Sequence, residues 1–124
     1  MERRSSPFVR IRYLDHEAVR EALAEYVEGL AAWHPELVRV VLFGSFVGDD
    51  AVPSSDIELL PVLEDSELPF LDRMPSFLPS RFPVGMDVFP DTREEMERML
   101  GEGNRFIASA LEGGVELYRR RAPG

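Results

Sequence analysis

The feature that most constrains the fold is a run of apolar and largely β-branched residues in the first half of the chain. Leu37–Phe43 reads Leu-Val-Arg-Val-Val-Leu-Phe and stops at Gly44. A strand of this composition is typical of the interior of a sheet, where both of its faces are covered. The sequence therefore predicts a sheet with Leu37–Phe43 inside it, and covering elements above and below.

Further strands are predicted where short apolar or alternating runs lie between turn-forming residues. They are Ile57–Leu63, Val84–Phe89 and Val115–Tyr118. Proline has no N–H to donate to a neighbouring strand. Pro61 therefore predicts that the pairing of Ile57–Leu63 is interrupted or that this strand lies at an edge.

Helical spacing of apolar residues predicts three helices. The first spans Asp15–Ala32, the second ends at Leu100, and the third ends at the Gly113-Gly114 pair. Asp15 is the expected N-cap of the first helix. The second is expected to open with a capping box, formed either by Asp91 with Glu94 or by Thr92 with Glu95. The segment Glu64–Pro83 holds closely spaced prolines, so it predicts short turns rather than one long helix.

These elements predict a single domain. With 124 residues the chain fits one hydrophobic core. The expected division is an N-terminal extension over residues 1–14, the domain over 15–118 and a basic tail over 119–124.

The composition excludes several kinds of chemistry. The chain has no Cys and two His, and all 14 basic residues are Arg, so Lys is absent. Thiolate nucleophiles, Cys-ligated or three-His zinc sites, Schiff-base lysines and the phosphate-binding lysine of P-loops are therefore excluded. The 23 acidic residues and formal net charge of −9 favour oxygen-ligated cations instead.

The same composition limits the expected partners and location. A net charge of −9 argues against non-specific binding of duplex nucleic acid, which depends on many cationic contacts to phosphate. No apolar run approaches the roughly 20 residues that span a bilayer, so no membrane association is expected. The polar first residues do not resemble a secretion signal, and a cytoplasmic location is expected.

Three carboxylates occupy unusual places in the predicted strands. Asp56 and Glu58 are two residues apart where a strand begins, so their side chains are expected on the same face. Asp87 lies among apolar residues in a later strand, where an isolated charge is costly unless it is paired or binds a metal. Carboxylates held close together repel one another unless a cation lies between them, so these three residues could hold Mg²⁺.

A glycine turn precedes the acidic residues and supplies groups suited to phosphate. Gly44 permits close approach of the backbone to a phosphate, and Ser45 offers a hydroxyl and an amide. A simpler interpretation stays open for each feature alone, because Gly-Ser is a common turn dipeptide and Asp-x-Glu can form the solvated face of a strand. The ordered combination with Asp87 is more specific than any one part.

The ordered set resembles the nucleotidyltransferases of the DNA polymerase β-like superfamily, especially the small members called minimal nucleotidyltransferases. The matching motifs are Gly44-Ser45, Ser55-Asp56-Ile57-Glu58-Leu59 and the single acid Asp87. The Ser-Asp-Ile-Glu stretch is also similar to that of kanamycin-type nucleotidyltransferases. The resemblance extends over most of the chain and implies the polymerase β palm-like fold, which is of the α+β class and has a small mixed β-sheet with helices packed against it.

The resemblance also implies a reaction and its site. It implies a Mg²⁺-dependent enzyme that transfers a nucleoside monophosphate, AMP for example, from ATP or another nucleoside triphosphate to an acceptor hydroxyl. Asp56, Glu58 and Asp87 would be the catalytic and metal-binding residues, with two Mg²⁺ ions. Gly44, Ser45 and Ser55 would bind the nucleotide. The displacement at phosphorus builds charge on the entering and leaving oxygens, and paired metals would neutralise both.

Two features leave an alternative open. Glu58 replaces the commoner second Asp, and the residues after Ser45 lack an arginine that many minimal members carry. The alternative is a catalytically impaired binding module, such as an antitoxin-type partner of a HEPN-domain protein. A homodimer, as in kanamycin-type enzymes, is a further implied assembly, and a small acidic domain with no nucleotide function stays open as a third interpretation. The sequence does not indicate the acceptor.

Overall fold

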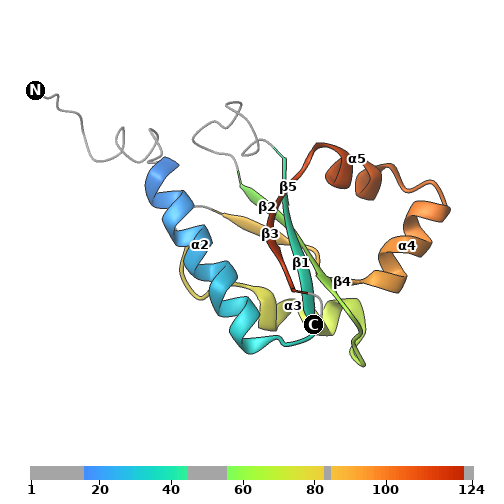
Figure 1. Cartoon of the computed structure of the whole chain (residues 1–124), viewed down its shortest axis with the longest axis horizontal. Coiled ribbons are helices and arrows are strands. Elements are labelled where there is room, and N and C mark those ends of the chain that lie inside the picture. The colour runs from blue at the N-terminus through green and yellow to red at the C-terminus, as the bar shows by residue number, and fades with distance from the viewer. Residues whose placement is uncertain (1–15, 45–55, 83–84, 122–124) are drawn as a thin grey trace, which may run out of the picture.

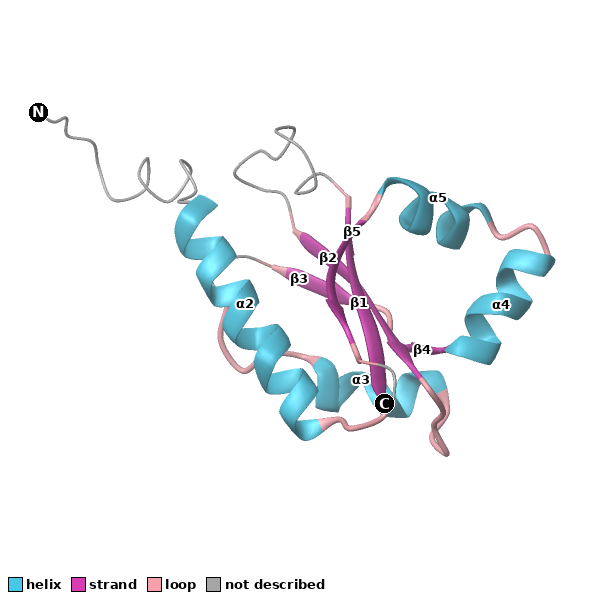
Figure 2. Ribbon diagram, in the orientation of Figure 1, coloured by secondary structure: helices cyan, strands magenta, loops and turns pink. Residues whose placement is uncertain are grey.

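The computed structural model describes residues 16–44, 56–82 and 85–121. These residues form four helices and a five-stranded mixed sheet (Figures 1 and 2). In chain order the elements are α2 (His16–Trp33), β1 (Leu37–Phe43), β2 (Ile57–Leu63), α3 (Phe70–Phe77), β3 (Met86–Val88), β4 (Asp91–Thr92), α4 (Arg93–Gly101), α5 (Arg105–Gly113) and β5 (Val115–Arg119). The predicted N-terminal extension and the N-cap Asp15 lie outside the described residues. No helix in the described ranges combines the length and the apolar character needed to cross a membrane.

The sheet has the strand order β3-β2-β1-β5, and β4 pairs with β2. The strand β1 runs antiparallel to β2 and β5, whereas β2 runs parallel to β3 and β4. The interior position predicted for Leu37–Phe43 is therefore confirmed, because β1 has a partner on each side. The mixed sheet with packed helices confirms the predicted fold class.

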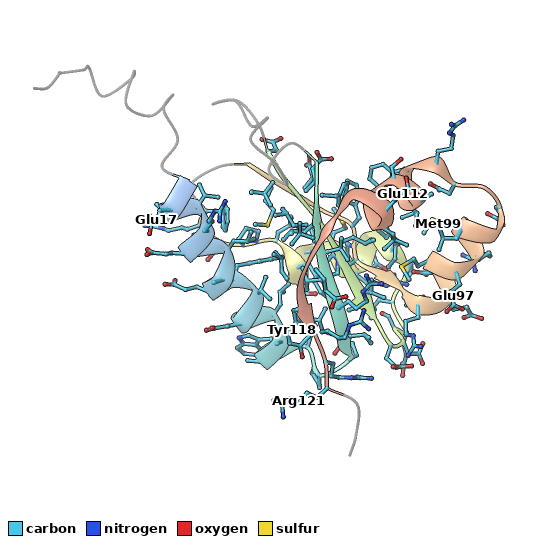
Figure 3. The ribbon with its side chains drawn as sticks, turned by 45° about the horizontal axis from the view of Figure 1, so that its top comes forward. Glu17, Glu97, Met99, Glu112, Tyr118 and Arg121 are labelled. Carbon is cyan, nitrogen blue, oxygen red and sulfur yellow. The ribbon has the colours of Figure 1, made fainter. Side chains whose placement is uncertain are left out.

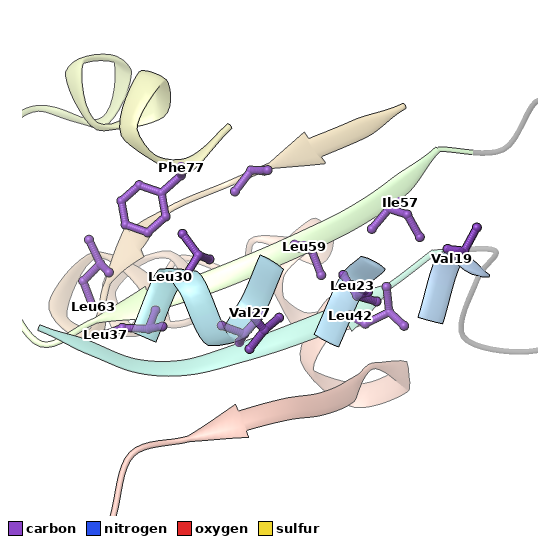
Figure 4. Packing of buried hydrophobic residues seen from close by; sticks show 12 residues of the cluster. Val19, Leu23, Val27, Leu30, Leu37, Leu42, Ile57, Leu59, Leu63 and Phe77 are labelled. Atoms are coloured by element: carbon purple, nitrogen blue, oxygen red, sulfur yellow. The ribbon is translucent and has the colours of Figure 1, made fainter. Parts of the chain in front are cut away.

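Each face of the sheet is covered by helices (Figure 1). The sheet face that carries the side chains of Val40 and Leu42 packs against α2 and Phe77 in one apolar cluster, which Figure 4 draws. The face of Val41 and Phe43 packs against α4 and α5 in a second cluster. Successive residues of β1 thus belong to different clusters, as the two-residue repeat of a strand requires.

Pro61 lies at an interruption of the pairing, as predicted. The amide of Ile57 donates to the carbonyl of Gly85, and the carbonyl of Leu59 accepts from the amide of Phe89. Peptide groups of odd-numbered β2 residues therefore face β3 and β4. The partner β3 ends beside Leu59 and β4 begins beside Val62, so Pro61 faces the break between them, where no N–H is needed.

The prediction of short turns throughout Glu64–Pro83 was wrong for Phe70–Phe77, which forms α3. Pro69 occupies the N-cap, and its carbonyl accepts from the amides of Asp72 and Arg73. Pro75 lies inside the helix and removes one intrahelical donor. Burial of Arg73 and Phe77 at 3% and 2% exposure compensates for that loss, and such tertiary contacts are not encoded by proline spacing.

The helix ends follow local capping signals. The capping box at α4 is formed by Thr92 and Glu95, so that alternative is confirmed over Asp91 with Glu94. The cap of α5 was not predicted: the side chain of Asn104 accepts from the amide of Ile107 at 3.0 Å. The strand β5 extends to Arg119, one residue beyond the predicted end, because Arg119 pairs with Arg39 of β1.

Candidate active site

The strand register brings two of the predicted acidic residues side by side. Glu58 of β2 is the direct partner of Asp87 of β3. Partners in neighbouring strands direct their side chains to the same face of a sheet. Asp56 immediately precedes β2, two residues before Glu58, so all three acidic residues lie at one end of these strands. This face of the sheet is the one that α4 and α5 cover farther along β2, since Leu60 and Val62 belong to the second cluster.

Two glycines leave the space that two of these carboxylates occupy. A Cβ atom at Gly44 would stand 2.3 Å from Oε2 of Glu58. A Cβ atom at Gly85 would stand 2.3 Å from Oδ1 of Asp56. Real Cβ atoms do not approach other atoms this closely, so any larger residue at either position would displace the carboxylate.

The conformation of Gly44 also favours glycine. It directly follows β1 and adopts φ of 87°. This left-handed region is disfavoured for side chains other than glycine. The end of β1 is therefore specified both by backbone conformation and by contact with Glu58.

The ionisation of Glu58 is affected by its burial and by the two other acidic residues. Partial burial, the charge of Asp87 and the charge of Asp56, in that order, raise the pKa of the Glu58 carboxyl above its usual value. Burial is the largest cause, and the contribution of the two neighbouring anions indicates negative potential at Glu58. Such a site attracts a cation, and a bound cation would reverse the shift.

The donor set suits Mg²⁺, although it is not gathered around one point. In residues 16–44, 56–82 and 85–121, no three acidic or histidine side chains are arranged as a metal-binding group. The Glu58 carboxylate lies beside Gly44, and the Asp56 carboxylate lies beside Gly85. Mg²⁺ is held in many proteins by one or two carboxylates together with substrate phosphates and waters, so a preformed cage is not required.

Two predicted nucleotide-binding residues, Ser45 and Ser55, lie outside the described residues. Gly44 is described and ends β1 beside Glu58. Residues 45–55, which connect Gly44 to Asp56, lie outside the described residues. Of the predicted site residues, the structure describes Gly44, Asp56, Glu58 and Asp87.

A cluster of phenylalanines lies beside the acidic residues. Phe43 is the cross-strand partner of Glu58, and its ring centroid lies 6.0 Å from that of Phe89 and 5.3 Å from that of Phe106. The rings of Phe89 and Phe106 are 5.1 Å apart. Phe106 is 47% exposed although it belongs to this cluster.

Gly85 is the site component that sequence reasoning missed. Its importance depends on lying opposite Asp56, which follows from the parallel pairing of β2 with β3. A glycine before a short strand carries no local signal of that pairing. Only the register identifies it as the residue that accommodates a carboxylate.

No family profile and no curated protein matches the sequence. A solved structure from Sulfolobus solfataricus, provisionally described as a nucleotidyltransferase, is similar to the chain with a TM-score of 0.61 and 21% sequence identity. The similarity covers 94% of this chain and 91% of the other. The chain therefore has a nucleotidyltransferase-like fold.

Proposed function

We propose that this protein is a Mg²⁺-dependent nucleotidyltransferase that moves a nucleoside monophosphate, with AMP as the first candidate, from a nucleoside triphosphate to an acceptor hydroxyl. The observation that carries the proposal is the alignment of Glu58 with Asp87 in adjacent parallel strands, with Asp56 two residues away. The nucleotidyltransferase-like fold supports the same reaction class.

Asp56, Glu58 and Asp87 are the residues that would hold Mg²⁺. When bound there, the metal would neutralise charge on the triphosphate and on the entering and leaving oxygens. Gly44 would admit a phosphate close to the backbone at the end of β1, since it has no side chain. The three carboxylates supply the negative field that makes a cation favourable at this end of the sheet.

The reaction is a displacement at the α-phosphorus of the triphosphate. A bond forms between the acceptor oxygen and the α-phosphorus, and the bond from the α-phosphorus to the bridging oxygen breaks, releasing pyrophosphate. The hydroxyl proton of the acceptor passes to a carboxylate, for which Asp87 is the candidate. Holding acceptor and triphosphate in line is the main contribution expected of the protein.

Metal binding gives the first test. Mn²⁺, which substitutes for Mg²⁺ in many oxygen-ligated sites, is titrated into the wild type and Asp56→Ala while free Mn²⁺ is measured by electron paramagnetic resonance. We expect Asp56→Ala to weaken Mn²⁺ binding in the presence of ATP by at least about tenfold. Asp72→Ala is the matched control, because Asp72 is an exposed acidic residue of α3.

Label transfer separates catalysis from binding alone. ATP labelled at the α-phosphate is incubated with the protein, Mg²⁺ and mixtures of hydroxyl-bearing acceptors, including a cell extract. Label transfer lost in Asp56→Ala supports the enzyme. Metal-dependent ATP binding without transfer would favour the impaired binding module, including an antitoxin-type partner of a HEPN-domain protein. No ATP binding at about millimolar concentration would refute the proposed nucleotidyltransferase activity.

A further inference from the structure

A cleft lies on the face of the sheet that carries Glu58, and two members of the phenylalanine cluster, Phe89 and Phe106, line it. Its volume is about 570 Å³, within the range of small-molecule sites. It lies between α4, α5 and the first residue of α3. Its apolar walls include Phe70, Phe89, Met99 and Phe106, and Figure 3 labels Met99 on α4.

The cleft contains a buried carboxylate. Asp91 lines it and is only 6% exposed. No residue in the described part of the chain donates a hydrogen bond to its side chain or forms an ion pair with it. Burial, followed by the charge of Glu95, raises the pKa of Asp91 to about 6, despite the opposing effect of Arg73.

The side chain of Arg73 donates its hydrogen bonds to groups other than Asp91. Arg73 donates to both carboxylate oxygens of Glu95 at 2.7 Å, and also to the carbonyls of Leu68 and Pro90 at 2.9 Å each. These bonds pair Arg73 with Glu95, so within the described residues Arg73 acts on Asp91 only through its charge and not through a hydrogen bond or an ion-pair contact. Burying an ion without a partner is costly, and such residues concentrate at functional sites.

We propose that this cleft binds an organic monocation, a primary ammonium group attached to an aromatic or hydrocarbon body. The ammonium group would donate hydrogen bonds to the Asp91 carboxylate, and the body would lie against Phe70, Phe89 and Phe106. The proposal does not depend on nucleotidyl transfer, because it concerns binding without metal or nucleotide.

The lining of the cleft favours this ligand over other classes. An anion would meet the charge of Asp91 in a poorly hydrated place. A neutral apolar molecule would leave the carboxylate without a partner, whereas an ammonium group supplies both charge and donors. Aromatic walls are also favourable to a cation. Arg98 at the exposed part of the lining disfavours a second positive charge, so a monocation is expected.

The test compares two probes of nearly equal size by nuclear magnetic resonance titration at pH 7.5. They are 2-phenylethylammonium and the neutral alcohol 2-phenylethanol, each added up to about 10 mM without metal or nucleotide. We expect the ammonium probe to shift the amide signals of Asp91, Asn104 and Phe106. We also expect it to bind at least about tenfold more tightly than the alcohol.

Two variants identify the group responsible. Asp91→Asn keeps the shape of the side chain and removes the charge, and it should reduce binding of the ammonium probe at least about tenfold. Glu94→Gln is the matched control, because Glu94 is an exposed acid of the same region and does not line the cleft. Its affinity should stay within about twofold of the wild type.

Three results would overturn the proposal. They are equal affinity for the amine and the alcohol, unchanged affinity in Asp91→Asn, or no shifts in the cleft at about 10 mM probe. Because Asp91→Asn removes an unfavourable buried charge, it is expected to fold. Binding of the amine with no nucleotidyl transfer would leave this inference intact and refute only the proposed reaction.

Discussion

Gly85 provides the space in which the carboxylate of Asp56 lies: a Cβ atom at position 85 would stand 2.3 Å from Oδ1 of Asp56. The equivalent relationship joins Gly44 to Glu58, at the same distance. Two residues without side chains thus fix where two acidic side chains lie. The candidate site can therefore be perturbed without changing any acidic residue.

Gly85→Ala should weaken metal binding while leaving the fold nearly intact. Gly85 does not adopt a left-handed backbone, and the atoms its Cβ would meet are the end of a flexible side chain. The carboxylate of Asp56 must therefore move away from its present position. We expect ATP-dependent Mn²⁺ affinity to fall about tenfold, with a change of less than about 1 kcal/mol in the free energy of unfolding.

The control for Gly85→Ala is Gly29→Ala in α2, where no atom lies within 4 Å of the added Cβ. That change should stabilise the helix by about 0.5–1 kcal/mol and leave Mn²⁺ affinity unchanged. Equal Mn²⁺ affinities for Gly85→Ala and the wild type would show that the position of the Asp56 carboxylate does not matter for metal binding.

Gly44→Ala should destabilise the protein more than Gly103→Ala. Both glycines have positive φ, 87° and 80°, so both alanines bear similar backbone strain of about 1 kcal/mol. Only position 44 also has the Glu58 carboxylate within 4 Å, whereas Gly103 has nothing there. The difference in free energy of unfolding, measured by urea denaturation, isolates the contact with Glu58.

A double variant checks the cause of that difference. Adding Glu58→Ala to Gly44→Ala removes the atoms that the new Cβ would meet, so the extra loss beyond Gly103→Ala should disappear. Non-additivity of this kind is the signature of residues in contact. If the two changes are simply additive, the carboxylate of Glu58 does not restrict position 44.

Asp91→Asn should stabilise the protein at neutral pH. The pKa of Asp91 is raised to about 6 in the folded protein, so its ionisation disfavours the folded state. The resulting loss of stability develops as pH rises from about 4 to 6 and is complete above that range. Asparagine avoids it, and we expect a gain of up to about 3 kcal/mol at pH 8.

The gain from Asp91→Asn should be absent at pH 3.5, where Asp91 is neutral in the folded protein. Urea unfolding at both pH values measures it, with Glu94→Gln as the control of equal charge change. Greater stability of the wild type than of Asp91→Asn at pH 8 would mean that the carboxylate has a stabilising partner.

Glu95→Gln should have the opposite pH dependence. Hydrogen bonds from Arg73 are the main cause that lowers the pKa of Glu95 to about 2. A lowered carboxyl pKa contributes stability above the ordinary value of 4.5, and this contribution is lost as pH falls toward 2. We expect Glu95→Gln to be less stable than the wild type by about 1–3 kcal/mol at pH 7.

The two proteins should converge as pH falls from 4.5 toward 2, because Glu95 itself becomes neutral there. Glutamine can still accept at the start of α4, so the capping box is preserved in part. Circular dichroism during urea unfolding provides the measurement. A difference that persists unchanged at pH 2 would show that the ion pair with Arg73 is not its source.

Local sequence patterns were sufficient for most elements. The bounds of β1 and β2 match the predicted Leu37–Phe43 and Ile57–Leu63, since each is a continuous apolar run ended by polar or turn residues. The capping box of α4 could be recognised because Thr92 and Glu95 are three residues apart. The helix α3 could not be recognised from local patterns, because its stability depends on burial of Arg73 and Phe77 against distant segments.

The candidate site was only partly predictable. The acidic residues Asp56, Glu58 and Asp87 stand out in sequence as charges at or within apolar strands. The partnership of Glu58 with Asp87 depends on which strands are neighbours and in which register. The roles of Gly85 and Asp91 depend on contacts across the sheet and across the cleft, so no local pattern indicates them.

The sequence by itself determined the secondary structure of the two central strands, the acidic character of the protein and the residue types available for chemistry. Only the tertiary structure decided that Glu58 faces Asp87, that glycines accommodate two carboxylates, and that Asp91 is buried without a partner in the described part of the chain. The physical reason is that strand propensity and capping act over a few residues. Strand order, register and burial are set by the packing of segments far apart in the chain.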